Sequence, residues 1–439
     1  MTLSEICKAV KLRINASDIA TRMANGAFWS FTGTALAKAL AMIAGIICAR
    51  ILGKETYGQY GLVKVTLNTF IVLGGAGLGI TATKYISEYL RSQKNRISSI
   101  YFITNGFAAI MAVIMFLVVY FSASFLSNNV LKTPSLESTL RLTSFILIIL
   151  VVNTAQDGVL AGFEDFRAKA ISAFLGSIFQ VLLIISLAYY WGLNGAVLGH
   201  GLGFCISAVF NKIFINRNFN KHEIKQELKT IRIGDIKMVY KFTLPAVMSS
   251  FLIVPVYFMV RIMIKRYVDF YEMADYDVGD QWRLLILFVP TSICAIVLPI
   301  LSSINNSEKH KFWKVLNLNI LLNGSIAAVI ALLVIAFSKI ILSFYGPDYN
   351  NTFPLIVLSI TCIFISMAAV VGNAIVSLGY MWTSLLFNLF WAVIVLFLAY
   401  LLLEHGFGVN GVAVAMLISY LISFIAQYSY LRITHRGNN

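Results

Sequence analysis

The stretch FWSFTGTALAKALAMIAGIICARIL, residues 28–52, decides the fold, because it is long, apolar and charged only at Lys38 and Arg50. A helix needs about 20 apolar residues to cross the roughly 30 Å hydrocarbon core of a bilayer, and this run is longer. Arg50 stands at its end, where a long side chain reaches the interface. Lys38 stands near its centre, where inserting a lysine costs about 2.5 to 3.5 kcal/mol. We therefore expect Lys38 to face a wet cavity or a partner.

The composition of the whole chain agrees with this first helix. Of the 439 residues, 59% are hydrophobic and 12% are charged, against about 25% charged in an ordinary soluble domain. The longest polar stretch, residues 216–241, is too short to bury a core of its own. The sequence predicts an all-α integral membrane protein whose chemistry lies within or between helices.

The apolar runs predict twelve transmembrane helices. Their approximate ranges are 28–52, 62–87, 100–122, 138–161, 168–191, 196–215, 242–264, 281–304, 315–337, 353–376, 383–403 and 409–431. The corresponding organisation is an N-terminal segment (1–26), an N-terminal lobe (27–215), a basic linker (216–241), a C-terminal lobe (242–431) and a tail (432–439). Residues 265–280, rich in Asp and Glu, are expected to form an outer loop.

The basic residues predict the orientation. Lys and Arg number 34 against 19 Asp and Glu, and basic residues of membrane proteins collect in cytoplasmic loops. Of these 34, 22 fall on the side of the N-terminus and 6 on the opposite side. We expect both termini in the cytoplasm, in a protein of the inner cell membrane. The net charge of +15 then needs no nucleic-acid partner.

The two halves of the chain resemble each other. GLNGAVLG at 192–199 recurs as GVNGVAVA at 408–415, an offset of 216 residues, and each copy opens the last helix of a six-helix set. Six helices return the chain to the side where it started, so the copies have the same orientation. The sequence thus predicts two six-helix lobes related by a pseudo-two-fold axis along the membrane normal, the parallel-repeat plan of transporters.

Four cations inside the predicted spans are candidates for a substrate pathway: Lys38, Lys64, Arg141 and Arg261. The last three lie within about one turn of the outer surface, so their side chains could equally extend to the interface. If the four converge, the cavity between the lobes is positive and its cargo is anionic. Phosphate is the favoured group, because Arg grips it through two parallel hydrogen bonds.

Uncharged and acidic residues add candidates. Asp157 is the one carboxylate well inside a predicted span, and three roles are open: pairing with a cavity cation, binding an H⁺ or Na⁺ that drives transport, or local capping. Asn68, Asn153 and Gln156 either hydrogen-bond sugar hydroxyls in the same cavity or bridge helices.

Motifs of other function classes are absent from the sequence. There is no Walker loop, no HExxH and no GxSxG, and the five histidines lie far apart. We expect no catalytic residue, no metal site and no bound cofactor. We therefore expect that the protein is not an enzyme.

The N-terminal sequence ANGAFWSFTGTALAKALAMIAGIICARILGKETYGQYGLVKV, followed by GLGITATKYISEYL, closely resembles the signature of the polysaccharide (O-antigen type) flippases. These belong to the multidrug/oligosaccharidyl-lipid/polysaccharide exporter superfamily. ILSSI after Pro299, GYMWTS and GVNGVAVAMLISY resemble later landmarks of the same family. The resemblance covers nearly the whole chain.

The resemblance implies a V of two six-helix lobes around a cationic cavity. It implies that the cargo is an undecaprenyl-diphosphate-linked oligosaccharide, flipped from the inner to the outer leaflet by alternating access for surface polysaccharide assembly. A monomer working beside a polysaccharide polymerase and chain-length machinery is expected. Two alternatives remain: a multidrug or lipid II exporter of the same superfamily, and a membrane polysaccharide polymerase or ligase. The latter usually needs a larger outer loop than any here.

Overall fold

The computed structural model describes residues 18–227, 253–302 and 309–436, together with positions 234–236, 239 and 243, and these ranges contain helices but no strand. In the first half these are α2 (Asp18–Leu52), α3 (Lys54–Ser92), α4 (Ile97–Phe125), α5 (Glu137–Gly162) and α6 (Phe166–Lys221). In the second half they are α8 (Ile253–Tyr267), α9 (Phe270–Ile286), α10 (Phe288–Ser302), α11 (Lys309–Ala336), α12 (Ser338–Tyr345), α13 (Phe353–Ser377), α14 (Met381–Glu404) and α15 (Gly408–Arg436).

Short helical turns connect some of these helices. They are η1 (Lys94–Arg96) before α4, and η2 (Leu126–Val130) and η3 (Pro134–Leu136) between α4 and α5. Much of the expected N-terminal segment 1–26 and of the basic linker 216–241, and the start of the expected seventh helix, lie outside the described residues.

Eight described helices are long and apolar enough to cross a membrane, so the chain is a multi-pass membrane protein. Helix α3 adds a ninth candidate if its two parts, bent by 43° near residue 76, count as one span. The number falls below the predicted twelve partly because α6 joins the predicted fifth and sixth helices. The predicted seventh and eighth overlap α8, α9 and α10, which are individually short.

Helix α6 turns back on itself at Gly192, whose backbone (φ 54°, ψ −131°) is not helical. A residue with a Cβ is disfavoured at positive φ, so the glycine permits the break. The two arms then pack closely, because a Cβ on Gly199 would lie 2.6 Å from the backbone nitrogen of Ile184. The predicted break between the fifth and sixth helices at GLNG is therefore present.

The same turn recurs in the second half. Gly408, at the start of α15, has φ 55°, close to the 54° of Gly192. Asn194 accepts a hydrogen bond from Thr139 at the start of α5 (2.7 Å), and Asn410 accepts one from Asn351 just before α13 (2.9 Å). Helices also pair in matching ways, since α3, α4 and α6 pack on α5 as α10, α11 and α15 pack on α13. These matches agree with an internal duplication.

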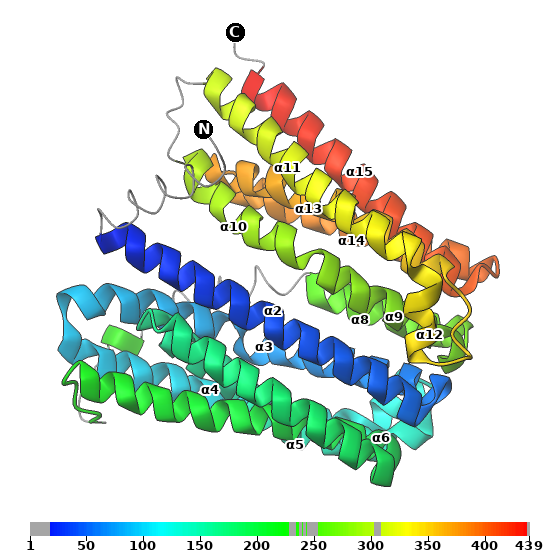
Figure 1. Ribbon diagram of the computed structural model, residues 1–439, viewed down its shortest axis with the longest axis horizontal. Helices are drawn as coiled ribbons and strands as arrows, with labels where there is room; N and C mark the ends of the chain where they lie inside the picture. Colours follow the sequence, from blue (N-terminus) through cyan, green and yellow to red (C-terminus); the bar gives the residue numbers. More distant parts are fainter. Residues whose placement is uncertain are drawn as a thin grey trace.

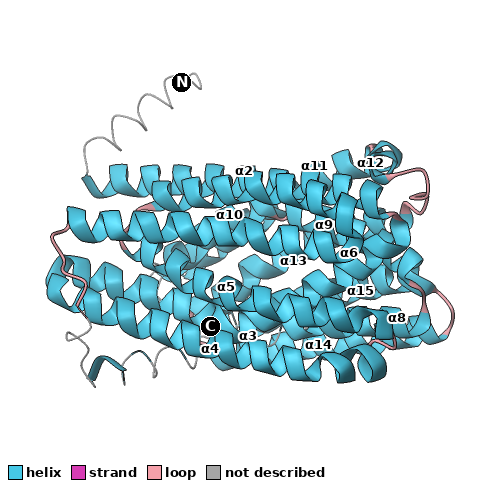
Figure 2. Cartoon of the chain, turned by 90° about the horizontal axis from the view of Figure 1, so that it is seen from below, coloured by secondary structure: helices cyan, strands magenta, loops and turns pink. Residues whose placement is uncertain are grey.

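Helices α2–α6 and α8–α15 form two groups, below and above in Figure 1, which spread apart at the left and converge at the right. Seen from below, the long helices run nearly parallel to the long axis (Figure 2). Where the groups converge, α8 and α9 pack on α3 and α12 packs on α2. The prediction that residues 265–280 form an acidic loop is wrong: most of them belong to α9, whose Asp275, Asp277 and Asp280 are buried.

Candidate functional site

A cavity of about 720 Å³ lies between the two helix groups. Helices α3, α5 and the second arm of α6 form one wall, and α8 and α9 form the other. Its lining residues are Tyr57, Gly61, Lys64, Val65, Leu67, Asn68, Ile71, Leu150, Asn153, Thr154, Asp157, His200, Phe204, Ile253, Val254, Tyr257, Arg261, Asp277, Asp280, Gln281, Arg283 and Leu284.

Two of the three cations that line this cavity are paired with carboxylates. Arg261 donates from Nε to Asp277 Oδ1 at 3.0 Å and from Nη2 to Asp280 Oδ2 at 2.8 Å. Arg283 donates from Nε to Asp280 Oδ1 at 2.7 Å. All four side chains are buried. Removal of charges from water is costly unless they are paired in this way, so these contacts hold α8 against α9.

Lys64 is the remaining lining cation. It is half-buried on α3, and its Nζ lies 4.9 Å from the centre of the Tyr60 ring. Within the described part of the chain, Lys64 forms no ion pair. A ligand in the cavity can therefore approach the charge of Lys64 without displacing a carboxylate.

Asp277 approaches α3 closely. A Cβ on Gly61 would lie only 1.8 Å from Asp277 Oδ2, so Gly61 leaves the space that this carboxylate occupies. Asp277 Oδ2 is buried and has no hydrogen-bond partner among the residues that the structure describes. The α3 wall thus combines a small residue at Gly61 with a cation one turn later at Lys64.

The part of the cavity wall formed by α5 and α6 carries polar side chains, of which Asp157 is charged. Asn211 Nδ2 donates to Asn153 Oδ1 at 2.9 Å and to Asp157 Oδ1 at 2.8 Å, joining α5 to the second arm of α6. His200 Nδ1 and Gln180 Nε2 lie 2.6 Å apart. This wall offers amide, carboxylate and imidazole groups for hydrogen bonding.

The predicted site residues are therefore only partly brought together. Lys64, Arg261, Asp157, Asn68 and Asn153 line the cavity, and Gln156 does not. Whether any of them contacts a substrate stays a prediction.

Lys38 lies at the margin of the cavity rather than in its lining. Its Nζ donates to the carbonyl oxygen of Leu284, a lining residue on α9, at 3.3 Å, and lies 5.3 Å from the centre of the Phe288 ring. Lys38 thus has a partner, as expected for a lysine in mid-span, and that partner belongs to the other helix group.

Arg141 lies elsewhere. Its side chain is 47% exposed and donates to Glu137 one turn earlier on α5, at 2.7 Å. The guanidinium also lies 5.5 Å from the centre of the Tyr120 ring. The expectation that Arg141 shares a chamber with the other cations is not met, because its counter-charge stands beside it on the helix surface.

One end of the cavity is closed by contacts between the two groups. Arg50 donates from Nε to the Phe344 carbonyl at 2.6 Å. Lys54 Nζ lies 3.0 Å from Asp275 Oδ2, and both side chains are 4% exposed. Lys54 also donates to the Asp348 carbonyl at 3.0 Å. We call these residues, together with Gln281, Tyr57 and Tyr345, the sealing layer.

Gln281 is the centre of the sealing layer. Its Oε1 accepts hydrogen bonds from the hydroxyls of Tyr57 (3.0 Å) and Tyr345 (3.1 Å). A Cβ on Gly45 would lie 2.4 Å from Gln281 Nε2, so the glycine on α2 lets α9 approach. The layer therefore connects α2 and α3 of the first group with α9 and α12 of the second.

Comparison with known proteins identifies the family. The family described as polysaccharide biosynthesis protein matches residues 23–305, more than half of the chain. The chain belongs to this family. The predicted resemblance to the polysaccharide flippases is thereby confirmed.

Two curated relatives of this polysaccharide biosynthesis family member carry descriptive names. The EPS I polysaccharide export inner membrane protein EpsE of Ralstonia nicotianae is 20% identical over 325 residues, which are 70% of this chain and 71% of the relative. The lipid III flippase of Escherichia coli is 20% identical over 292 residues, which are 65% of this chain and 68% of the relative.

The fold of this family member is also that of a solved transporter. An inward-facing multidrug resistance MATE family transporter of the MOP superfamily superimposes with a TM-score of 0.81. The match covers 91% of this chain and 95% of the other at 16% identity. At that identity the likeness establishes the fold alone.

The sequence analysis of this polysaccharide biosynthesis family member did not place three charged residues in the cavity. Asp277, Asp280 and Arg283 were assigned to an outer loop or a helix end, although they lie in the cavity wall. The i, i+3 spacing of Asp280 and Arg283 was the available signal. Across the described ranges, no group of three or more His, Cys, Asp or Glu side chains could hold a metal ion.

Proposed function

We propose that this protein is a flippase that moves undecaprenyl-diphosphate-linked oligosaccharides from the inner to the outer leaflet for surface polysaccharide assembly. The family match supports this proposal, as do a lipid III flippase and a polysaccharide export protein among the relatives. The observation that carries it is the cavity between the two helix groups with Lys64 in its wall. The protein then acts as a transporter, not an enzyme, and as a monomer that delivers cargo to a polysaccharide polymerase and its chain-length machinery.

The mechanism proposed is alternating access by two six-helix lobes. The recurrence of the glycine turn at Gly192 and Gly408, and of the helix pairings around α5 and α13, supports two like-oriented repeats, twelve helices in all. The sealing layer lies at the C-terminal end of α2. If the N-terminus is cytoplasmic, as the basic residues predict, the layer closes the outer side and this conformation faces inward.

Lys64 is proposed as the anchor for the diphosphate. Arg261 and Arg283 already hold Asp277 and Asp280, so a phosphate gains little from them unless a carboxylate moves away. A phosphate near Lys64 instead meets a partly desolvated cation, where Coulomb attraction is stronger than in water. The greasy polyprenyl chain would stay in lipid while the headgroup crosses.

The polar wall is proposed to receive the sugars and a coupling ion. Asn68 and Asn153 offer amide groups to sugar hydroxyls at the cavity surface. Asp157 keeps one carboxylate oxygen beyond the hydrogen bond from Asn211, and it is the proposed position for an H⁺ or Na⁺ that drives transport.

Gene disruption tests this function. Loss of the protein is expected to remove surface polysaccharide and to leave a polyprenyl-diphosphate-linked glycan on the inner leaflet. Isolation and mass analysis of the accumulated lipid identify the cargo. Normal surface polysaccharide without an accumulated lipid-linked glycan would contradict the proposal, and accumulation of unpolymerised repeat units on the outer leaflet would point to a polymerase instead.

A further inference from the structure

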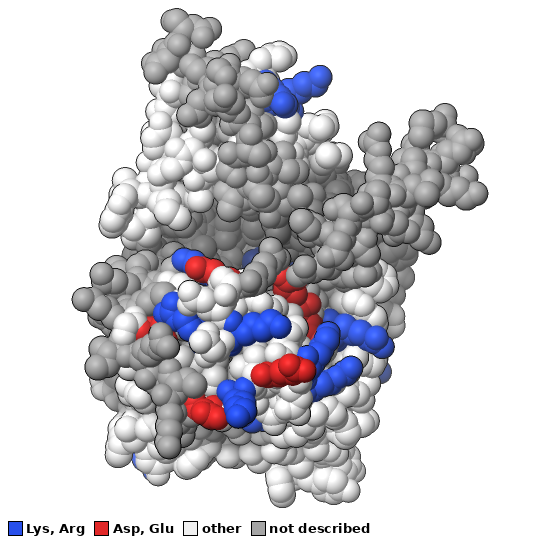
Figure 3. All heavy atoms as spheres, turned by 90° about the vertical axis from the view of Figure 1, so that its left-hand side faces the viewer, with Lys and Arg blue, Asp and Glu red and all other residues white. Residues whose placement is uncertain are grey.

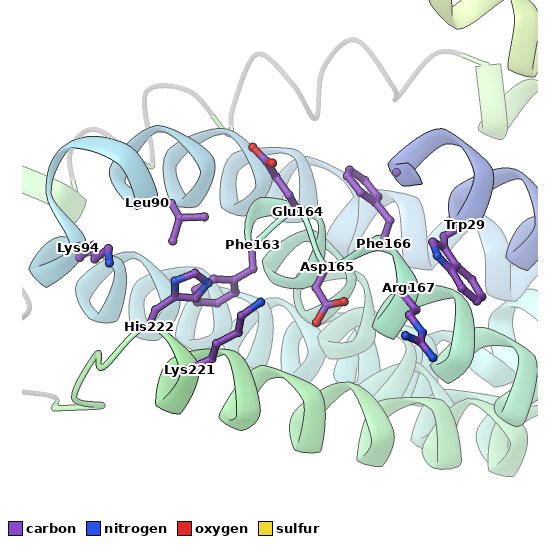
Figure 4. Close-up of a pocket in the computed structure, with 11 residues that line it drawn as sticks. Trp29, Leu90, Lys94, Phe163, Glu164, Asp165, Phe166, Arg167, Lys221 and His222 are labelled. Atoms are coloured by element: carbon purple, nitrogen blue, oxygen red, sulfur yellow. The ribbon is translucent and has the colours of Figure 1, made fainter. Parts of the chain in front are cut away.

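A second hollow, of about 710 Å³, lies at the end of the first helix group where α2 begins. It shares no lining residue with the central cavity. It is surrounded by the turn between α5 and α6, the C-terminal end of α6, the end of α3 with η1, and the start of α2 (Figure 4). We call it the surface hollow.

Basic side chains from separate parts of the chain meet at the surface hollow. Lys94 comes from η1, Arg167 from the first turn of α6 and Lys221 from its last residue. Neither Lys94 nor Lys221 forms an ion pair with any residue that the structure describes, and the Arg167 guanidinium lies 5.2 Å from the centre of the Trp29 ring. Figure 3, which views this end of the molecule, shows Lys and Arg over the first helix group, with Asp and Glu side chains among them.

The nearby carboxylate of Asp165 forms no ion pair with these three cations. Its Oδ1 accepts a hydrogen bond from the backbone N–H of Ala168 at 3.0 Å, and its Oδ2 accepts one from Asn218 at 2.8 Å. Asp165 therefore fastens the α5–α6 turn to the end of α6. The other lining carboxylate, Glu164, points away from Lys221 in Figure 4.

Aromatic rings complete the wall. Phe163 and His222 stack with ring centres 5.8 Å apart and planes 12° from parallel, and Trp29 lies at the other end of the hollow (Figure 4). Burial, together with nearby Lys221 and Lys94, lowers the pKa of His222. The imidazole is thus less readily protonated than usual, and the cationic charge rests on the lysines and Arg167.

The hollow lies where several candidate spans begin or end, which is the level at which lipid headgroups are expected. Candidate spans begin at Phe28, end at Gly162, and run from Phe166 to Lys221, and all of these ends border it. Trp side chains favour this interfacial level, and basic pockets between transmembrane helices bind phosphate-bearing headgroups there.

We propose that the surface hollow binds the phosphate of a lipid headgroup, held by Lys94, Lys221 and Arg167. The phosphate can come from a bulk anionic phospholipid or from the diphosphate of a polyprenyl-linked glycan before it enters the central cavity. The second source rests on the proposed function, and the first does not.

Native mass spectrometry of the full-length protein in detergent tests the proposal. The probes are phosphatidylglycerol, undecaprenyl diphosphate and zwitterionic phosphatidylcholine, each titrated against wild type and the double variant Lys94→Gln/Lys221→Gln. The control is Lys225→Gln, an exposed lysine that does not line the hollow. Because each surface lysine contributes roughly tenfold or less to anionic-lipid binding, the double variant is expected to bind at least one anionic probe about 10- to 30-fold more weakly.

Each outcome either supports or overturns the proposed headgroup site. Weaker binding of both anionic lipids by the double variant alone supports a general headgroup site. Weaker binding of undecaprenyl diphosphate alone supports a site that receives cargo. Equal binding of both probes by wild type and the double variant overturns the proposal. An equal loss in Lys225→Gln also overturns it, because the effect would then come from overall charge. Transport is not measured, so failure here is distinct from failure of the flippase function.

Discussion

Arg261 on α8 and Asp277 on α9 form a buried ion pair in the cavity wall, with Nε 3.0 Å from Oδ1. The same guanidinium reaches Asp280, which also holds Arg283. Two arginines and two aspartates thus cancel each other within the wall. Lys64 is then the lining cation that no described carboxylate pairs with, and Asp157 is the third lining carboxylate.

Removing Arg261 alone is expected to destabilise the protein. Arg261→Gln leaves Asp277 buried without its cation, a change that costs about 3 to 5 kcal/mol for a buried pair. The measurement is the melting temperature of the purified protein in detergent. The double variant Arg261→Gln/Asp277→Asn, which removes both charges, should recover much of the loss. If both variants are equally unstable, the pair does not hold the wall together.

Gly61→Ala is expected to disturb the contact between the helix groups, since its Cβ would overlap Asp277 Oδ2. Gly106→Ala in α4 is the matched control, because nothing lies within 4 Å of a Cβ there. Exchange of a helical Gly for Ala in open space stabilises by about 0.5 to 1 kcal/mol. Thermal unfolding should therefore separate the two variants in opposite directions. Equal stability would mean that α9 adjusts freely.

Weakening the sealing layer is expected to expose the cavity from the other side. Asp275→Asn removes the charge that pairs with Lys54. The control is Glu55→Gln, which changes an exposed carboxylate next to Lys54 in α3. Labelling of a cysteine at the cavity residue Asn68 (Asn68→Cys) by a membrane-impermeant maleimide added outside whole cells reports the opening. Faster labelling is expected with Asp275→Asn only. Unchanged labelling in both variants would show that the layer is not the gate.

Asp157→Asn is expected to reduce export less than Lys64→Gln does. Its carboxylate accepts from Asn211, and the amide retains an oxygen that can do the same. The readout is surface polysaccharide in cells lacking the native gene, with protein levels matched. A loss as complete as that of the lysine variant would make Asp157 essential and assign it the coupling role.

The sequence predicted the features that local pattern determines. Apolar length predicted the spans, the GLNG and GVNG turns predicted the breaks at Gly192 and Gly408, and the polar residues inside spans predicted Lys64, Arg261 and Asp157 in the cavity wall. The position of Arg141 was also open to prediction, since Glu137 stands at i−4 on the same helix and pairs with it.

Features that depend on distant residues were missed. The acidic segment 265–280 has the composition of a loop, and packing against α3 and α13 makes α9 a buried helix. Likewise, the partner of Lys38 is a carbonyl oxygen 246 residues away. A single sequence carries no signal for such pairs.

The proposed transport depends on Lys64, which meets the phosphate of the cargo inside the cavity. The most direct test is flipping of a fluorescent undecaprenyl-diphosphate oligosaccharide in proteoliposomes by wild type, Lys64→Gln and Lys64→Arg. Lys64→Gln is expected to lose most of the flipping, by about tenfold or more for a partly desolvated charge pair, while Lys64→Arg keeps a substantial part and both variants fold normally. Flipping by Lys64→Gln at the wild-type rate would show that Lys64 does not hold the phosphate during transport.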